Sequence, residues 1–271
     1  MNQENFTNEY DTWIATGLLR YVEISGTKTA VRVFLNDKPK TYLFVHGVGG
    51  DFHGLVPLAY SLKDSVNIVF VDLPCHGSSD FLTDTTLGDM LTWSESLLPN
   101  LGAVGILVDG VIAHSFGCAV ITQMDAEKKW YLNPPIKTFT SAKRYAAFIY
   151  RFRYVFMWVY ELYPFAVWRG KIMLRHKNIK SRSIVKWVTR CTKISHKQYL
   201  AHVALVHEFI SNYQLQIPKQ KFVGIISSDH DTMASSGKSD RLYDEFVSID
   251  AGHLSCFEAP EKIAELIRKT I

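Results

Sequence analysis

The segment Val111-Ile112-Ala113-His114-Ser115-Phe116-Gly117 decides the fold. It ends a short apolar run and opens a helical stretch, and a serine in this position is typical of a nucleophile elbow. The turn lifts the serine hydroxyl above the sheet. It requires small residues two positions before and two positions after the serine, because the strand and helix backbones nearly touch. Ala113 and Gly117 occupy these positions, so Ser115 is the candidate nucleophile.

Short apolar runs and helical stretches alternate on both sides of this segment. Apolar runs separated by helices are typical of parallel strands that are buried on both faces of a sheet. We expect strands at residues 18–24, 30–35, 41–45, 67–71, 104–112, 129–132, 222–226 and 246–249, and helices near residues 55–62 and 86–98, from residue 115 onward and at 260–271. The sequence therefore predicts an α/β fold with a mostly parallel central sheet and helices on both of its faces.

Composition narrows the class of protein. The 271 residues are 47% hydrophobic and 21% charged, which excludes disordered, collagen-like and disulfide-scaffold chains. The four cysteines lie singly without a CxxC pair, so we expect reduced thiols and no zinc site. The N-terminal residues carry acids and lack the basic and apolar parts of an export signal. We therefore expect a cytoplasmic protein.

The alternation of strands and helices stops at residues 136–219, which contain long helical stretches. We interpret this segment as a helical cap inserted into a core of residues 1–135 and 220–271. Residues 146–168 hold ten aromatic side chains among 23 positions, and their charges and a proline argue against a membrane span. Aromatic side chains of such a cap would either pack inside it or form the apolar roof of a pocket. The candidates for substrate contact are Phe148, Phe152, Phe156 and Trp158.

Two other strand ends carry residues that would complete a nucleophilic site. The loop His46-Gly47-Val48-Gly49-Gly50 can present a backbone N–H to negative charge on a carbonyl oxygen. A plain turn or a phosphate cradle is the alternative, although the Lys-Ser/Thr ending of a nucleotide loop is missing. Downstream, Ser227-Ser228-Asp229-His230-Asp231 and Ala251-Gly252-His253 end successive strands. Serine, acid and histidine in this chain order are typical of a catalytic triad, with Asp229 and Asp231 both open as the acid.

These segments together resemble the α/β-hydrolase superfamily over nearly the whole chain outside the cap. The resemblance rests on Leu43-Phe44-Val45-His46-Gly47, Val71-Asp72-Leu73-Pro74-Cys75-His76-Gly77-Ser78, Asn133-Pro134-Pro135, Gly252-His253-Leu254 and Glu258-Ala259-Pro260. Ala113 and Cys75 each replace a residue that is usually glycine in the family.

The resemblance implies a role for each matching residue. Ser115 would be the nucleophile, His253 the general base and then acid, and Asp231 the residue that orients His253. The family's spacing from the strand end favours Asp231 over Asp229. The backbone N–H groups of Val48 and Phe116 would form the oxyanion hole. The other histidines at these strand ends, His46, His76 and His114, would support the loops.

The resemblance also implies an activity, that of a serine-dependent carboxylic ester hydrolase working through an acyl-enzyme without a metal or an organic cofactor. The family's dehalogenases and epoxide hydrolases use an aspartate where this chain has Ser115. Lipases, thioesterases and C–C bond hydrolases share the triad, and a non-catalytic binding protein with this fold is the competing class. The aromatic cap predicts medium or longer acyl esters as substrates in preference to acetate.

The uneven distribution of charge along the sequence indicates an anionic partner for the cap. Residues 137–219 have a net charge of +14, and the rest of the chain has a net charge of −10. The basic cap resembles, in arrangement, that of esterases that demethylate pimeloyl-carrier esters in biotin synthesis, so we favour an acyl carrier protein over an anionic membrane surface and expect no nucleic acid. The candidate contacts are Arg151, Arg153, Arg169, Lys171, Arg175, Lys177, Lys180, Arg182 and Lys186.

Overall fold

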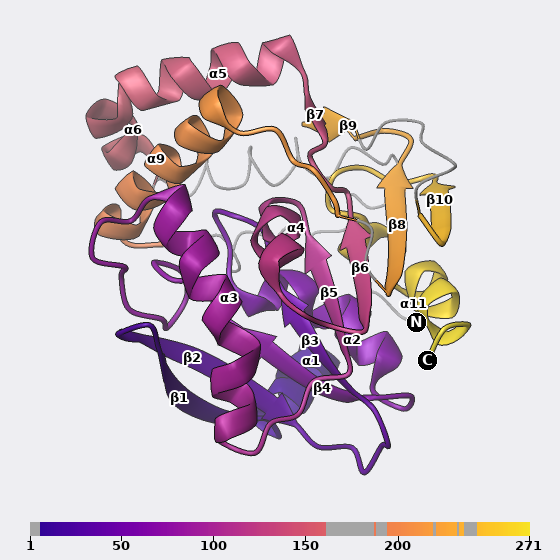
Figure 1. Cartoon of the computed structure of the whole chain (residues 1–271). Coiled ribbons are helices and arrows are strands. Elements are labelled where there is room, and N and C mark those ends of the chain that lie inside the picture. Colours follow the sequence, from indigo (N-terminus) through magenta and orange to yellow (C-terminus); the bar gives the residue numbers. More distant parts are fainter. Residues whose placement is uncertain (1–5, 161–186, 188–193, 219–220, 232, 236–242) are drawn as a thin grey trace.

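An eight-stranded sheet with the order β1-β2-β4-β3-β5-β6-β8-β10 forms the centre of the computed structural model, which describes residues 6–160, 187, 194–218, 221–231, 233–235 and 243–271 (Figure 1). The strands from β4 to β10 are parallel, whereas β2 is antiparallel to both of its neighbours. The strand bounds are β1 Leu18–Ile24, β2 Thr27–Phe34, β3 Thr41–Val45, β4 Asn67–Val71, β5 Gly110–His114, β6 Lys128–Leu132, β8 Phe222–Ser228 and β10 Glu245–Ile249. The predicted fold class is confirmed.

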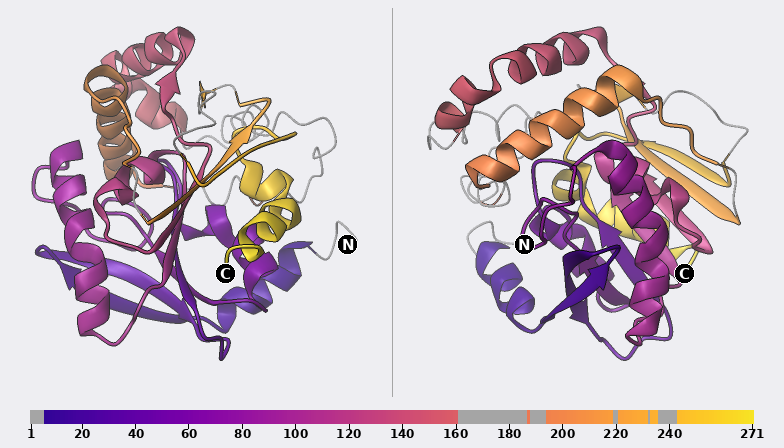
Figure 2. Two further views of the ribbon diagram at one scale, coloured as in Figure 1. Left: turned by 45° about the vertical axis from the view of Figure 1, so that its right-hand side comes forward. Right: turned by 60° about the vertical axis from the view of Figure 1, so that its left-hand side comes forward.

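Both faces of the sheet are buried, and successive side chains along a strand point to opposite faces. In β3, Leu43 and Val45 join one apolar cluster, while Tyr42 and Phe44 join the other. The first cluster includes residues of α3 (Leu87–Ala103), α4 (Phe116–Val120) and α9 (His196–Asn212), and the second includes residues of α1 (Phe6–Ala15), α2 (Val56–Leu62) and α11 (Pro260–Arg268). Figure 2 shows these two layers on opposite sides of the sheet. The two-sided burial explains why most strands have continuous apolar sequences.

The expected strand at residues 104–112 is wrong at residues 104–109, because β5 begins only at Gly110. The backbone N–H groups of Val104 and Ile106 donate to the carbonyl oxygen of Leu101, and Gly105 has a φ of 82°. These apolar residues therefore end helix α3 through a left-handed turn, as in the usual helix C-terminal motif. Apolar character alone did not distinguish such a helix end from a strand.

Three helices, α5 (Thr140–Arg151), α6 (Arg153–Tyr160) and α9, lie beyond the carboxyl ends of the parallel strands, as Figures 1 and 2 show. A two-stranded antiparallel sheet of β7 (Lys137–Thr138) and β9 (Ala234–Ser235) lies near them. A capping box of Ser195 and Gln198 starts α9. The predicted boundaries of the cap stay a prediction, and part of that segment lies outside the described residues.

Candidate functional site

Ser115 stands in a strained turn between β5 and α4, with φ 53° and ψ −120°. A Cβ atom on Gly117 would lie 2.5 Å from the carbonyl oxygen of His46 and 2.7 Å from that of Val45, closer than real contacts allow. The loop after β3 is thus packed directly against the first turn of α4. Backbone strain that the surrounding structure holds in place is common at functional sites.

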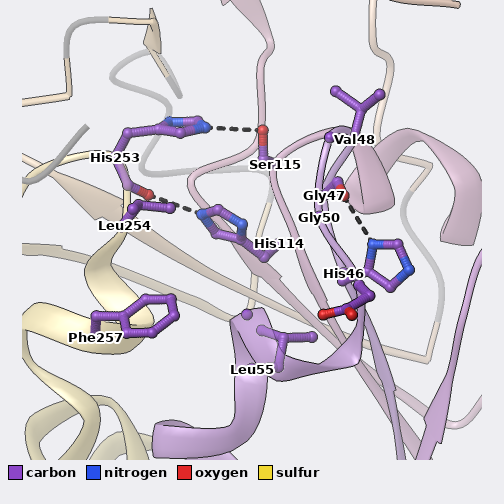
Figure 3. A pocket seen from close by; sticks show the side chains of 13 residues that line it. His46, Gly47, Val48, Gly50, Leu55, His114, Ser115, His253, Leu254 and Phe257 are labelled. Carbon is purple, nitrogen blue, oxygen red and sulfur yellow. Dashed lines mark hydrogen bonds between the residues drawn. The ribbon is translucent and has the colours of Figure 1, made fainter. Parts of the chain in front are cut away.

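The structure brings Ser115, His253 and Asp231 together in one hydrogen-bonded chain. Nε2 of His253 is 2.9 Å from Oγ of Ser115, and Nδ1 of the same ring is 2.9 Å from Oδ2 of Asp231. Figure 3 shows the His253 ring pointing at Ser115 from the loop after β10. The side chains of His253 and Asp231 are both more than nine-tenths buried. This is the geometry of a nucleophile, a base and an orienting acid.

The acid in contact with the histidine is Asp231, not Asp229. Burial would raise the pKa of Asp231, but the charge and hydrogen bond of His253, together with two other donors, lower it below its usual value. These donors are the backbone N–H of Met233 at 2.8 Å and the amide of Asn133 at 3.0 Å. Asp229 is exposed, and its carboxylate accepts a hydrogen bond from Ser248 on the neighbouring strand.

Asn133 is a member of the site that the sequence pattern did not indicate. Its side chain is 1% exposed, donates to Asp231, and accepts from Ser255 Oγ at 2.6 Å. The residue has a φ of 50°, a left-handed conformation that asparagine tolerates better than most residues. Its place at the end of β6, beside the acid-bearing end of β8, was the signal in the sequence. Asn133 therefore links Asp231 to the segment that follows His253.

Two further residues hold the loop that carries His253. Nε2 of His114 donates to the carbonyl oxygen of His253 at 2.8 Å. The pKa of His114 is lowered to about 3, first by burial and then by the neighbouring His253, so the ring is neutral and keeps this tautomer. The carboxylate of Glu258 accepts from the backbone N–H of Gly252 at 2.7 Å. Both contacts hold the backbone of this loop, at Gly252 and at His253.

The glycine-rich loop after β3 is held by two other histidines. Nδ1 of His46 donates to the carbonyl oxygen of Gly47 at 2.8 Å, and Nε2 accepts from the backbone N–H of Leu73. Nε2 of His76 accepts a long hydrogen bond from the N–H of Gly49, while Nδ1 donates to Pro74. Burial lowers the pKa of His76 well below its usual value, which keeps Nε2 available as an acceptor.

Two cavities meet at this loop. The smaller, of about 70 Å³, is lined by Ser115, His253, the loop itself and the apolar side chains of Leu55 and Phe257 (Figure 3). The larger, of about 220 Å³, lies between the loop and the helices α5, α6 and α9. Both cavities include Val48 and Gly49 in their linings. The predicted oxyanion residue Val48 therefore borders both cavities.

The larger cavity is mainly apolar. Its lining from the three helices includes Ala142, Ala146, Ile149, Phe156, Val203 and Val206. His202 also lines it, with its ring stacked on His76 at a centroid distance of 3.7 Å and its Nε2 donating to the carbonyl oxygen of Cys75. Cys75 has a φ of 66°, which explains why glycine is the easier residue at this position.

Of the four aromatic residues predicted for substrate contact, Phe156 lines the larger cavity. Phe148, Phe152 and Trp158 do not line it, and their side chains are 51%, 44% and 67% exposed. Substrate contact by these three residues stays a prediction. Aromatic residues occur on both faces of α5 and α6, so their number in the sequence does not indicate which face turns inward.

The structure describes two of the nine predicted partner contacts. Arg151 is exposed at the end of α5, whereas the guanidinium of Arg153 lies over the rings of Tyr150 and Tyr154 and donates to the carbonyl oxygen of Tyr150. Arg169, Lys171, Arg175, Lys177, Lys180, Arg182 and Lys186 lie outside the described residues. Within the described ranges there is no group of three or more His, Cys, Asp or Glu side chains suited to a metal ion. No helix in this part of the chain is long and apolar enough to cross a membrane.

A mostly parallel sheet with a serine elbow, an acid and a histidine at neighbouring strand ends defines the class of α/β-hydrolase-fold proteins. A family model described as "Alpha/beta hydrolase family" matches residues 42–266. The chain belongs to this family, and family membership together with the geometry of the site supports a hydrolase activity.

Solved structures share the fold at low sequence identity. An enol-lactonase from Burkholderia xenovorans LB400 superposes with a TM-score of 0.73 at 14% identity, covering 93% of this chain and 100% of that one. A thermophilic esterase from Thermogutta terrifontis superposes with a TM-score of 0.68 at 15% identity, covering 93% of this chain and 97% of that one.

One curated relative is similar over a shorter stretch. It is the dihydrolipoyllysine-residue acetyltransferase component of an acetoin cleaving system from Cupriavidus necator, 36% identical over 86 residues. The match covers 31% of this chain and 22% of the relative. Because this chain spans under a quarter of the relative's length, the likeness concerns one part of that protein alone.

Proposed function

We propose that the chain is a serine-dependent carboxylic ester hydrolase that works through an acyl-enzyme. The observation that carries the proposal is the continuous hydrogen-bond chain from Ser115 through His253 to Asp231, with 2.9 Å at each step. A histidine that accepts from a serine hydroxyl on one nitrogen and is held by a carboxylate on the other activates that serine as a nucleophile.

In the acylation step, Oγ of Ser115 attacks the ester carbonyl carbon while its proton passes to Nε2 of His253. The carbonyl oxygen gains negative charge, which the backbone N–H groups of Val48 and Phe116 stabilise. Phe116 is the first residue of α4, so its N–H has no partner within the helix. When the bond to the alcohol oxygen breaks, His253 gives that oxygen its proton, and the acyl group stays on Ser115.

In the deacylation step, a water molecule takes the place of the alcohol. It gives a proton to Nε2 of His253 as its oxygen attacks the acyl carbon, and the proton then returns to Ser115 as the carboxylic acid leaves. Asp231 stays ionised because its pKa is lowered, and it stabilises the cationic His253 ring in both steps. Asn133 and the N–H of Met233 orient the Asp231 carboxylate for this task.

The apolar cavity of about 220 Å³ supports a preference for medium or longer acyl esters. Each methylene buried in such a cavity contributes about 0.8 kcal/mol, or roughly a fourfold gain in kcat/KM. A series of p-nitrophenyl esters from acetate to decanoate tests this preference. We expect kcat/KM to rise over the first several chain lengths. The highest value for acetate, with a steady fall thereafter, would contradict the preference.

A fluorophosphonate probe tests the nucleophile itself. We expect mass spectrometry to find the label on Ser115 in the wild-type protein and no label in Ser115→Ala. Ser227→Ala is the matched control, because Ser227 lies on β8 and donates to Ser248 instead of His253; it should label as the wild type does. A folded wild-type protein that does not label would overturn the proposal in favour of a non-catalytic binding protein.

Paired substrates test the bond that is cleaved. The same preparation is assayed with oxygen esters and thioesters of one acyl group, so that only the leaving atom differs. We expect the oxygen ester to have the higher kcat/KM once each value is divided by the rate of spontaneous hydrolysis. A higher corrected value for the thioester would replace the ester hydrolase by a thioesterase.

A further inference from the structure

Helices α5 and α6 expose an outer face that is unusually apolar. The exposed fractions of its large side chains run from 44% to 67%. We name this set the outer aromatic face; its members are Tyr145, Phe148, Phe152, Tyr154, Val155 and Trp158. Scattered single apolar residues on a surface are ordinary, but six exposed ones within two consecutive helices are a concentration of the kind found at interaction sites.

The inner face of the same helices is already occupied. Ala142 and Ala146 are buried, and Ile149, Phe156 and Tyr160 line the larger cavity opposite α9. Across the junction of the two helices, the Phe148 ring packs against the rings of Phe152 and Phe156 at centroid distances of 5.1 and 5.6 Å. The Trp158 ring also packs edge-on against His196 of α9 at a centroid distance of 4.8 Å. Each of the six side chains of the outer aromatic face nevertheless keeps at least 44% of its surface exposed.

The charged side chains of α5 and α6 themselves have one sign. Residues 140–160 contain Lys143, Arg144, Arg151 and Arg153 and no acidic residue. The first three are exposed, while Arg153 lies over two tyrosine rings, an arrangement that keeps aromatic and cationic groups side by side. Exposed tyrosine and tryptophan next to lysine and arginine are the composition that the boundary between lipid headgroups and acyl chains favours.

We propose that the outer aromatic face of α5 and α6 docks onto an anionic phospholipid bilayer, with the aromatic side chains in the headgroup boundary and Lys143, Arg144 and Arg151 against lipid phosphates. An acidic carrier protein would match the cations but would not account for the exposed apolar surface of the outer aromatic face. The bilayer accounts for both features, because acyl chains receive the apolar side chains and anionic headgroups receive the cations.

The docking face is connected to the larger cavity. Tyr145 is half exposed on the outer face and also lines the cavity. Together with the proposed ester hydrolysis, on which this step rests, the arrangement assigns lipid esters as the substrate class. An acyl chain that leaves the bilayer beside Tyr145 would be one helix diameter from the apolar lining of the cavity. The docking itself does not depend on catalysis, so the two proposals can fail separately.

Vesicle binding of the inert Ser115→Ala protein tests docking without any hydrolysis. The probe is flotation with vesicles of phosphatidylcholine alone or with a third of phosphatidylglycerol. We expect binding to the anionic vesicles and a decrease with added salt. Replacing Lys143, Arg144 and Arg151 together by Gln should weaken this binding by roughly a hundredfold, because each cation contributes about a factor of five near an anionic surface. Absence of binding to either vesicle would overturn the proposal.

Aromatic variants separate a bilayer from a purely electrostatic partner. Phe148→Ser, Phe152→Ser and Trp158→Ser combined should weaken vesicle binding at least as much as the charge variant does. The control combines Leu19→Ser and Tyr21→Ser, which removes exposed apolar side chains on β1; it should bind as the parent does. If the aromatic variant binds undiminished while the charge variant does not, the cations alone form the site, and a soluble acidic protein such as an acyl carrier replaces the bilayer. Thermal unfolding checks that each variant folds.

Quenching by brominated lipid reports insertion directly. The fluorescence of the parent protein should fall when vesicles carry bromine in their acyl chains, and most of that fall should vanish in Trp158→Phe. Trp158 is 67% exposed, whereas Trp93, Trp130 and Trp187 are fully buried. Trp13 is half-buried and Trp168 lies outside the described residues, so the parent protein in this assay carries Trp13→Phe and Trp168→Phe. Quenching that persists unchanged in Trp158→Phe would show that another surface meets the bilayer and would overturn the assignment to α5 and α6.

Discussion

The carbonyl oxygen of His46 lies 2.5 Å from the point where a Cβ atom on Gly117 would stand. A single methyl group added to Gly117, in the first turn of α4, would therefore clash with the backbone of the loop after β3. The spacing of Ser115 from the proposed oxyanion amides therefore depends on the absence of a side chain at one position.

Gly117→Ala should lower both stability and activity. Forcing a Cβ atom into this contact displaces backbone, and overpacking of this kind costs about 1–3 kcal/mol of the free energy of unfolding. Urea denaturation measures that loss, and kcat for a p-nitrophenyl ester should fall with it because the loop moves away from Ser115. The matched control is Gly88→Ala in helix α3, where the nearest atom to the new Cβ lies 3.7 Å away. The control should be neutral or slightly stabilising, and equal effects of the two changes would contradict the packing argument.

Asp231→Asn should reduce kcat by about 10³- to 10⁴-fold, because an amide at this position cannot stabilise the His253 cation or hold its tautomer. Asp229→Asn is the control, since the Asp229 carboxylate contacts Ser248 and not the histidine. Steady-state kinetics of both variants on one ester decide the matter. A crippled Asp229→Asn beside a nearly normal Asp231→Asn would reverse the assignment of the acid.

Stability should fall as the pH is lowered below about 6.5. Burial lowers the pKa of both His114 and His202 to about 3. Between about pH 3 and the unfolded value of about 6.5, the unfolded chain binds more protons than the folded chain, so each ring lowers the free energy of unfolding by about 1.4 kcal/mol per pH unit. His202→Phe removes one such ring. Urea denaturation from pH 7 to pH 4.5 should show that the free energy of unfolding of this variant depends less steeply on pH, by that amount. A slope equal to that of the wild type would contradict a neutral, buried His202 ring.

Ala146→Phe should change the choice of acyl chain. Ala146 is buried and lines the larger cavity, so a phenyl ring there takes up space that a longer acyl group would use. We expect kcat/KM for decanoate to fall at least tenfold relative to butyrate. Ala147→Phe is the control, because Ala147 is the exposed neighbour on the same helix. A chain-length profile that is the same in both variants would place the acyl group elsewhere.

Local sequence was sufficient for the elements whose chemistry is local. The elbow needs an apolar run followed by a serine, with a small residue two positions before the serine and another two positions after it. Ala113, Ser115 and Gly117 meet these requirements. The same is true of the glycines after β3 and of the histidine after the last strand. Each of these positions is determined by a turn between a strand and its next element, so a few neighbouring residues specify it.

Contacts between distant segments could not be predicted in the same way. The residues alone left Asp229 and Asp231 both open as the acid, and the family resemblance favoured Asp231; the contact with His253 is seen only once β8 lies beside β10. Asn133 contacts Asp231, 98 residues later in the sequence, because β6 and β8 are neighbours in the sheet. Phe148, Phe152 and Trp158 alternate with cavity residues along two helices, and the side that turns inward depends on the packing of α9 against them. Apolar residues 104–107 end a helix through a glycine turn, which apolar character alone did not reveal.

Ser115 is synthesised long before Asp231 and His253 during translation. Ser115 and the loop after β3 come from the first half, but 138 residues separate Ser115 from His253. At about 5–20 residues per second, a ribosome needs on the order of ten seconds to add that stretch. β10, after which His253 stands, is an edge strand and pairs with β8. A nascent chain therefore contains Ser115 well before His253, and the proposed hydrolase would become competent only when β10 has joined the sheet.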